Sequence, residues 1–341
     1  MATMCLRQSG PNSILGWRLC FVGASLTEEV EGRRRVFCRK LVCYYDRDAA
    51  TRASTGGFTP ANIDPNLFST MVAAENSRSK FISSAITLLK DNGFDGLNLD
   101  WHYPGDEKKQ PKDKERFVLL CQELQTAFAP ESLILSATVS AKEDIITNSY
   151  PDPTAIANAV DFLNVLTFDF YDPSNTVTAH HSPLGALTTG DTLNTQYAMK
   201  HWVGLNVPAA KLNMGFAAFG VAYTLTDPNV SGVGAATNGS AEEGCYGGKR
   251  GIWSYYETCL YIQGGSLQWI SEQSVPYAVT EGQWVGYDNN DSIDAKVADI
   301  ASNGYGGAFV WALDLDDYTG QFCKAGINPF INHLKSKLST I

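Results

Sequence analysis

The chain has 341 residues, of which 44% are hydrophobic and 18% charged, and its formal net charge is −10. This balance is typical of a folded globular protein and argues against extensive disorder. The acidic charge argues against a nucleic-acid partner. No membrane partner is expected either, because no apolar stretch reaches the roughly 18–20 residues that a membrane helix needs.

The first forty residues show no clear periodicity. A basic run, Arg33-Arg-Arg35, lies near their end. Residues 14–26 are only a weak candidate for a signal peptide, because their charged flank and cleavage site are poor. Segment 1–40 is therefore predicted to be a disordered piece, separate from the domain that follows.

From residue 41 onward, short apolar runs alternate with segments of helical periodicity. Strands are predicted over residues 41–45, 94–101, 133–139, 162–168, 211–216 and 307–312. Helices are predicted over residues 76–92, 112–129, 154–159, 192–204, 293–303 and 327–338. Each strand is a nearly continuous apolar run, which indicates a buried parallel sheet. Both an open doubly wound sheet and a (β/α)8 TIM barrel fit this α/β pattern.

The alternation breaks between residues 223 and 284, where Gly, Ser, Asn and Tyr are frequent. This stretch predicts a small inserted α+β subdomain. Residues 46–75 contain no convincing strand, so six barrel strands are expected instead of eight. No Gly-rich phosphate loop follows the first strand, and no cofactor is expected.

The cysteines and histidines do not form a recognisable metal motif. The eight cysteines include no CxxC pair, which disfavours a zinc ribbon or a thioredoxin-type site. His180 and His181 are adjacent and lack the i, i+4 spacing of a helical metal site. No metal site is predicted.

Polar residues concentrate in the predicted strand 94–101 and just beyond it. Asn98, Asp100 and His102 alternate along the chain and should therefore share one face of the strand. In a barrel this face points inward, and its carboxyl end opens into the site. The strand leads into Trp101-His-Tyr-Pro104, so this end is predicted to be the functional site.

The sequence Asp95-Gly-Leu-Asn-Leu-Asp-Trp-His-Tyr-Pro104 resembles the signature strand of glycoside hydrolase family 18, the chitinases and chitinase-like lectins. The family pattern is D-G-x-D-x-D-W-E-Y-P. Further matches are spread over residues 41–338, which form the predicted domain of this family. They lie at residues 41–45, 58–64, 164–169, 214–225, 284–288 and 307–317.

In this family a glutamic acid protonates the glycosidic oxygen, and the acetamido group of the substrate acts as nucleophile. The resemblance places His102 at the position of that glutamic acid. A positioned general acid contributes about 10²–10⁴ in rate, and an imidazole is a poor replacement for it. Asp100 matches the family Asp beside the acid, Asn98 replaces a further Asp, and Asp169 on the sixth family strand is retained.

The resemblance also implies a set of ligand-binding positions. Phe168 and Phe219 stand where the family has tyrosines, and Val221 stands where it has an arginine, so polar groups are lost. Trp311 matches the tryptophan beneath the central sugar. The predicted ligand-binding residues are Tyr45, Trp101, Tyr103, Phe168, Phe219, Glu257 and Trp311.

The resemblance indicates that the second and third barrel strands are missing, with a junction at Leu67–Phe68. A real shortened variant and an error in the gene model both explain this gap. The family partner of Cys43 is lost at the junction, whereas Cys259 and Cys323 match a family disulfide.

These changes predict a catalytically inactive, extracellular chitinase-like protein that binds chitin or oligosaccharides of N-acetylglucosamine. Two alternatives remain open. One is an active chitinase with His102 as the acid, and the other is a non-catalytic, growth-factor-like signalling protein on the same scaffold. No oligomeric state is predicted.

Overall fold

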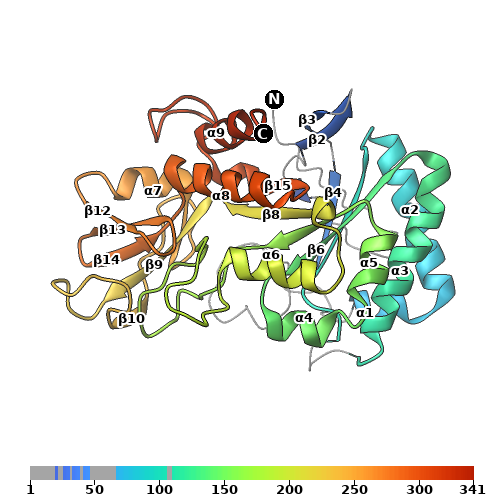
Figure 1. The fold of residues 1–341 in the computed structure, drawn as a ribbon, viewed down its shortest axis with the longest axis horizontal. Coiled ribbons are helices and arrows are strands. Elements are labelled where there is room, and N and C mark those ends of the chain that lie inside the picture. Colours follow the sequence, from blue (N-terminus) through green and yellow to red (C-terminus); the bar gives the residue numbers. More distant parts are fainter. Residues whose placement is uncertain (1–19, 22–25, 31–32, 39–40, 47–66, 106–109) are drawn as a thin grey trace.

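The computed structural model describes residues 20–21, 26–30, 33–38, 41–46, 67–105 and 110–341. Six parallel strands form the central sheet, in the spatial order β4-β5-β6-β7-β8-β15 (Figure 1). All six were predicted from the sequence, and the prediction is confirmed. Their bounds are β4 (Leu41–Asp46), β5 (Gly96–Trp101), β6 (Ile134–Ser140), β7 (Phe162–Leu166), β8 (Leu212–Ala217) and β15 (Gly307–Trp311).

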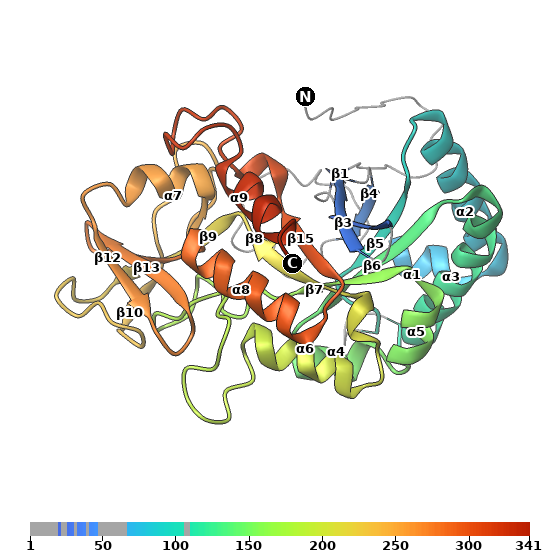
Figure 2. The ribbon, with the colours of Figure 1, turned by 45° about the horizontal axis from the view of Figure 1, so that its top comes forward.

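The sheet is buried on both faces. Every residue of β5 and of β8 is buried, as expected for strands covered by helices on one side and by barrel interior on the other. Helices surround the strands in both views (Figures 1 and 2). The helices are α1 (Leu67–Ala73), α2 (Glu75–Asp91), α3 (Asp113–Phe128), α4 (Glu143–Ser149), α5 (Pro153–Ala159), α6 (Thr195–Gly204), α8 (Asn290–Asn303) and α9 (Pro329–Leu338). Short 3-10 turns are η2 (Ala129–Glu131), η3 (Ala209–Lys211) and η4 (Leu313–Leu315).

Strand β4 pairs directly with β5, so two strands that follow each other in the sheet are separated by about fifty residues of chain. Within the described part of that interval there are two helices, α1 and α2, and no strand. The matched segment 58–64 lies outside the described residues. Over the described residues, the topology is therefore consistent with the gap that the sequence predicted after the first barrel strand.

The amino-terminal segment differs from its prediction. The sequence predicts no regular structure over residues 1–40, whereas the structure places three short strands in the described part: β1 (Cys20–Phe21), β2 (Leu26–Val30) and β3 (Arg33–Cys38). Strand β1 extends the central sheet by pairing antiparallel with β4. In the hairpin of β2 and β3, Glu28 is in register with Arg35 and Glu29 with Arg34.

A second, antiparallel sheet interrupts the barrel pattern between β8 and α8. Its order is β10-β9-β14-β13-β12, and β11 pairs with β9. It extends slightly beyond the insertion predicted over residues 223–284, and it lies on the opposite side of the molecule from α2 and α3 (Figure 1). Its elements are β9 (Phe219–Leu225), β10 (Thr237–Ser240), β11 (Ile252–Ser254), helix α7 (Tyr255–Tyr261), β12 (Ser266–Ile270), β13 (Val275–Thr280) and β14 (Gln283–Gly286).

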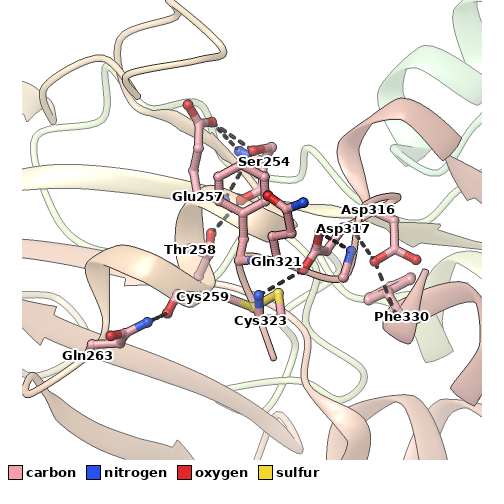
Figure 3. The surroundings of a disulfide bond; sticks show 12 residues. Ser254, Glu257, Thr258, Cys259, Gln263, Asp316, Asp317, Gln321, Cys323 and Phe330 are labelled. Atoms are coloured by element: carbon pink, nitrogen blue, oxygen red, sulfur yellow. Dashed lines mark hydrogen bonds between the residues drawn. A yellow bond between two sulfur atoms is a disulfide. The ribbon is translucent and has the colours of Figure 1, made fainter. Parts of the chain in front are cut away.

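One disulfide ties this insertion to the segment that follows β15. Cys259, in α7, is bonded to Cys323, and 64 positions separate them in sequence (Figure 3). This is the pair that the family resemblance implied. The Asp317 carboxylate accepts the backbone N–H of Cys323 at 2.8 Å and so fixes the returning segment beside α7. The side chain of Cys43 lies outside the described part of the structure.

Candidate functional site

The carboxyl end of β5 presents an imidazole next to a carboxylate. His102 Nε2 lies 2.7 Å from Asp100 Oδ1, within hydrogen-bonding distance. The Asp100 side chain is 1% exposed, whereas the His102 side chain is 23% exposed. The ring of Tyr103 stacks on that of His102 with 4.8 Å between centroids. His102 is therefore the solvent-facing member of a histidine–carboxylate pair at the predicted end of the strand.

Behind this pair, a row of buried polar side chains crosses the barrel interior. Asn98 Nδ2 donates to Thr138 Oγ1 at 2.8 Å, and Asn98 Oδ1 accepts from Ser136 Oγ at 2.8 Å. The row continues over β7 and β8, since Asn164 donates to Asn98 at 3.1 Å and Asn213 donates to Asn164 at 3.1 Å. Buried polar groups are stabilised when they are hydrogen-bonded in this way. These hydrogen bonds connect β5, the strand that contains Asp100, to β6 and β7, and through β7 to β8.

Sequence reasoning singled out Asn98 in this row but missed its partners on the neighbouring strands. Asn164 and Asn213 are polar residues within apolar strands, which is the same signal that drew attention to Asn98. Tyr45 lies in β4 in register with Asp100, and its side chain lies outside the described part of the structure.

An aromatic cluster lies beside the strand ends. Phe168 packs edge-on against Phe219, with 5.9 Å between centroids and 83° between ring planes, and also contacts Phe309. Trp311 and Tyr103 are partly buried against the same cluster. The structure therefore brings together Tyr103, Phe168, Phe219 and Trp311, four of the predicted ligand-binding residues. We call Phe168, Phe219, Phe309 and Trp311 the aromatic cluster.

Asp169 follows Phe168 and is oriented differently. Its side chain is 53% exposed, and its backbone has φ of 57°, a left-handed conformation that Asp tolerates better than most residues. The carboxylate thus faces solvent directly after a buried aromatic residue. Asp169 is therefore a partly exposed carboxylate directly after Phe168 of the aromatic cluster.

Two predicted ligand-binding residues have other surroundings. Trp101 is 1% exposed and stacks on Phe68 of α1 at 4.8 Å, with Phe117 of α3 edge-on at 6.1 Å. It packs against the helices on the opposite side of β5 from Asp100. This burial leaves no surface of Trp101 for a ligand, so we assign it to the hydrophobic core.

The prediction that Glu257 binds ligand is also corrected. It is fully buried, and its carboxylate accepts four hydrogen bonds, two from the backbone of Tyr246 and Gly247 and two from Ser254 (Figure 3). With Ser254 it forms the capping box at the start of α7. These contacts occupy the carboxylate, so the structure gives Glu257 a helix-capping role in place of the predicted contact with ligand.

A buried ion pair lies beneath the loop that follows Asp169. Lys296 Nζ donates to both carboxylate oxygens of Asp288, at 2.6 and 2.8 Å, and to Ser182 Oγ at 2.7 Å. Burial lowers the pKa of Lys296 against the attraction of Asp288. Burial acts to raise the pKa of Asp288, but Lys296 and its hydrogen bonds outweigh it and lower that pKa. The pair connects α8 to residue 182 of the loop.

His180 and His181 occupy this same loop and are fully buried. His180 Nε2 faces the carbonyls of Pro276 and Tyr287 at 3.1 and 2.9 Å, and burial lowers the His180 pKa to about 4.

Among the described residues, no group of three or more His, Cys, Asp or Glu side chains could hold a metal ion. No helix in the described part of the chain is long and apolar enough to span a membrane.

Comparisons with known proteins identify the family. Residues 32–316 match the family model of glycosyl hydrolases family 18. The chain is 36% identical to chitotriosidase-1 of Mus musculus over 300 residues, which cover 85% of the chain and 63% of the relative. It is 39% identical to the oviduct-specific glycoprotein of Sus scrofa over 295 residues, covering 84% and 55%. The chain therefore spans less than two thirds of the length of these relatives.

Solved structures agree with this result. Human YKL-39, described as a pseudo-chitinase with retained chitooligosaccharide-binding properties, superimposes with a TM-score of 0.77 at 32% identity, covering 88% of this chain and 80% of that one. Catalytic domain 2 of a group II chitinase from Ostrinia furnacalis also gives a TM-score of 0.77, at 30% identity, with 81% and 74% covered. The chain belongs to glycoside hydrolase family 18.

Proposed function

We propose that this protein is an inactive, chitinase-like lectin that binds oligosaccharides of N-acetylglucosamine without hydrolysing them. The observation that carries the proposal is His102, which lies at the open end of β5 where the family pattern has its catalytic glutamic acid. Its Nε2 is within hydrogen-bonding distance of the buried Asp100. The site thus keeps the carboxylate beside the acid position and lacks the acid.

The surrounding residues support binding more than hydrolysis. Trp311, the partly exposed member of the aromatic cluster, supplies apolar ring surface that suits the face of a sugar ring, and it packs against the buried Phe168, Phe219 and Phe309. Phe168 carries no hydroxyl with which to orient an acetamido group, and Val221 is fully buried and apolar. Human YKL-39 supplies a precedent within the family for binding that persists without activity.

Two assays on the wild-type chain test this proposal. Calorimetric titration with tetra-N-acetylchitotetraose is expected to show binding, and a fluorogenic chitobioside is expected to release no product above background. The variant H102E, which restores a carboxylic acid, should gain turnover, whereas H102A should bind and remain inactive. Product release by the wild type that is abolished in H102A would contradict the proposal.

The second candidate is an active enzyme in which His102 is the general acid. The 2.7 Å contact with Asp100 favours it, because a carboxylate that holds an imidazole is a common arrangement in acid–base catalysis. This candidate predicts product release from the wild type that H102A abolishes. Background release that is equal in the wild type and H102A would exclude it.

We further propose an extracellular location. The disulfide between Cys259 and Cys323 supports it, because such bonds persist mainly in oxidising compartments. The glycoproteins among the relatives are consistent with it. Detection of the full-length protein in culture medium, rather than in the cell lysate alone, tests this location.

A further inference from the structure

His181 is a buried polar residue whose ring makes no full hydrogen bond among the residues that the structure describes. Its side chain is fully buried, and neither Nδ1 nor Nε2 has a partner in hydrogen-bonding geometry there, although the backbone of Phe219 acts on the ring electrostatically. Buried polar groups nearly always make hydrogen bonds. A buried group without one therefore either destabilises the fold or forms its hydrogen bond when a ligand binds.

The position of His181 is fixed by its neighbours. Its ring stacks on that of His180 at 5.6 Å and lies 5.0 Å from the ring of Phe219, a member of the aromatic cluster. Its backbone carbonyl accepts the N–H of Phe170 at 3.0 Å, so the loop is held beside the residues that follow β7. The imidazole therefore has little freedom to turn towards another partner.

The ring is directed towards Asp169. His181 Nδ1 lies 3.9 Å from Asp169 Oδ1, which is about 1 Å beyond a normal hydrogen bond. The imidazole is fully buried, whereas the side chain of Asp169 is 53% exposed. Hydrogen bonds at binding sites are often long without ligand and shorten when the ligand is present.

The protonation state of His181 suits a donor of a single hydrogen bond. Burial lowers the pKa of His181 well below its ordinary value, with His180 and Lys296 acting in the same direction and Asp288 and the backbone of Phe219 against it. A neutral imidazole has one N–H donor and one acceptor nitrogen. With the proton on Nδ1, the donor faces the Asp169 carboxylate.

We propose that His181 is a positioning residue for ligand binding: its Nδ1–H closes onto Asp169 when that carboxylate accepts a hydrogen bond from an N-acetylated sugar. One oxygen of Asp169 then faces His181, and the other is directed at an N–H or O–H group of the ligand. The inference rests on the proposed function, since it gives Asp169 a sugar to bind.

The test compares three variants by calorimetric titration with tetra-N-acetylchitotetraose. His181→Leu keeps a similar volume but removes the donor, and it should weaken binding about tenfold or more, as expected for a hydrogen bond to a charged group. His181→Asn, whose amide nitrogen lies near the position of Nδ1, should restore part of the affinity. The control His201→Leu removes an imidazole from α6 and should bind as the wild type does.

Two further measurements separate positioning from a structural role. Because neither ring nitrogen of His181 makes a full hydrogen bond in the described part of the chain, His181→Leu should keep or raise the melting temperature. The imidazole proton of His181 should move downfield in NMR spectra when the oligosaccharide is added to the wild type, but not in Asp169→Asn. Equal affinity of His181→Leu and wild type, or a loss of affinity with a lower melting temperature that Asn does not restore, would overturn the inference alone. A wild type that binds no oligosaccharide would overturn the proposed function and this inference together.

Discussion

Replacing Lys296 by methionine tests how the buried ion pair contributes to stability. Lys296 lies in α8 with no exposed surface, and all three ammonium donors are used, two on Asp288 and one on Ser182. Methionine has a similar length and no charge, so the change removes the cation with little change in volume. Asp288 then remains buried without its counter-ion.

The expected loss follows from the contacts that remain. Removing one partner of a buried pair costs about 3–5 kcal/mol in free energy of unfolding, because the other charge is left uncompensated. Ser292 Oγ, at 2.7 Å, and Ser182 Oγ, at 3.1 Å, still donate to Asp288 in the variant. These two donors place the expected loss for K296M towards the lower end of that range, at about 3 kcal/mol.

Urea denaturation at neutral pH measures this loss, with two companion variants. K337M removes the lysine of a pair whose nitrogen is 2.6 Å from Asp294 but whose side chains are 41% and 39% exposed, so it should cost about 0–1 kcal/mol. The double variant K296M/D288N leaves no buried charge in the pair and should be more stable than K296M alone. A loss for K296M no larger than that for K337M, or a double variant less stable than K296M, would refute the reasoning.

Three further predictions concern acid stability, the disulfide and the aromatic cluster. The His180 pKa is lowered to about 4, so the folded state binds fewer protons than the unfolded chain between about pH 4 and 6.5, and this residue alone should lower stability by about 3 kcal/mol as the pH is lowered through that range, with buried His181 acting in the same direction. Thermal melts at several pH values check this, and H180N should reduce the slope. Replacing Cys259 and Cys323 by alanine opens a loop of 64 positions and should cost about 4 kcal/mol in urea denaturation, with no added effect of reductant. Trp311→Ala should weaken oligosaccharide binding about tenfold in calorimetry, whereas Trp269→Ala, on the exposed face of β12, should not.

The strands of the barrel could be predicted because each is mostly an apolar run, and in those whose side chains are described nearly every residue is buried. The hairpin of β2 and β3 could not, because its sequence is polar and its pairing depends on the register of residues 28–29 with 34–35. Local pattern is informative where burial is nearly complete, and it is weak for a short two-stranded hairpin.

Two site residues, Trp101 and Glu257, were assigned wrongly although local sequence rules indicated their roles. The alternation that places Asn98, Asp100 and His102 on one face of β5 also places Trp101 on the other, so the burial of Trp101 could have been derived from the sequence. Glu257 follows Ser254 by three residues at the start of a helix, which is the spacing of a capping box. For both Trp101 and Glu257, the match to the family motif predicted a contact with ligand. The strand alternation and the capping-box spacing instead predicted a buried and a helix-capping role, and they were given less weight.

Lys296 was missed although its position carried a signal. It lies three residues after Ile293 and four before Ile300, on the buried face of α8. A lysine on an apolar helix face requires a buried anion, but its partner Asp288 precedes the helix and could not be identified from periodicity. The pairing depends on the tertiary contact between α8 and the loop that contains Ser182.

Among the described residues, the interval between β4 and β5 contains helices and no strand, and this affects the sheet more than the candidate site. Phe168 follows β7, Phe219 begins β9, and Phe309 and Trp311 lie in β15, so no member of the aromatic cluster comes from the interval between β4 and β5. Strand β4 pairs with β5 over Leu41–Asp46 and keeps Tyr45 in register with Asp100. The described residues between β4 and β5 therefore contribute nothing to the aromatic cluster, and the strand ends that bear His102, Asp169 and Trp311 are all present. Sugar binding and stability should accordingly respond to different substitutions, with Trp311 affecting the former and Lys296 the latter.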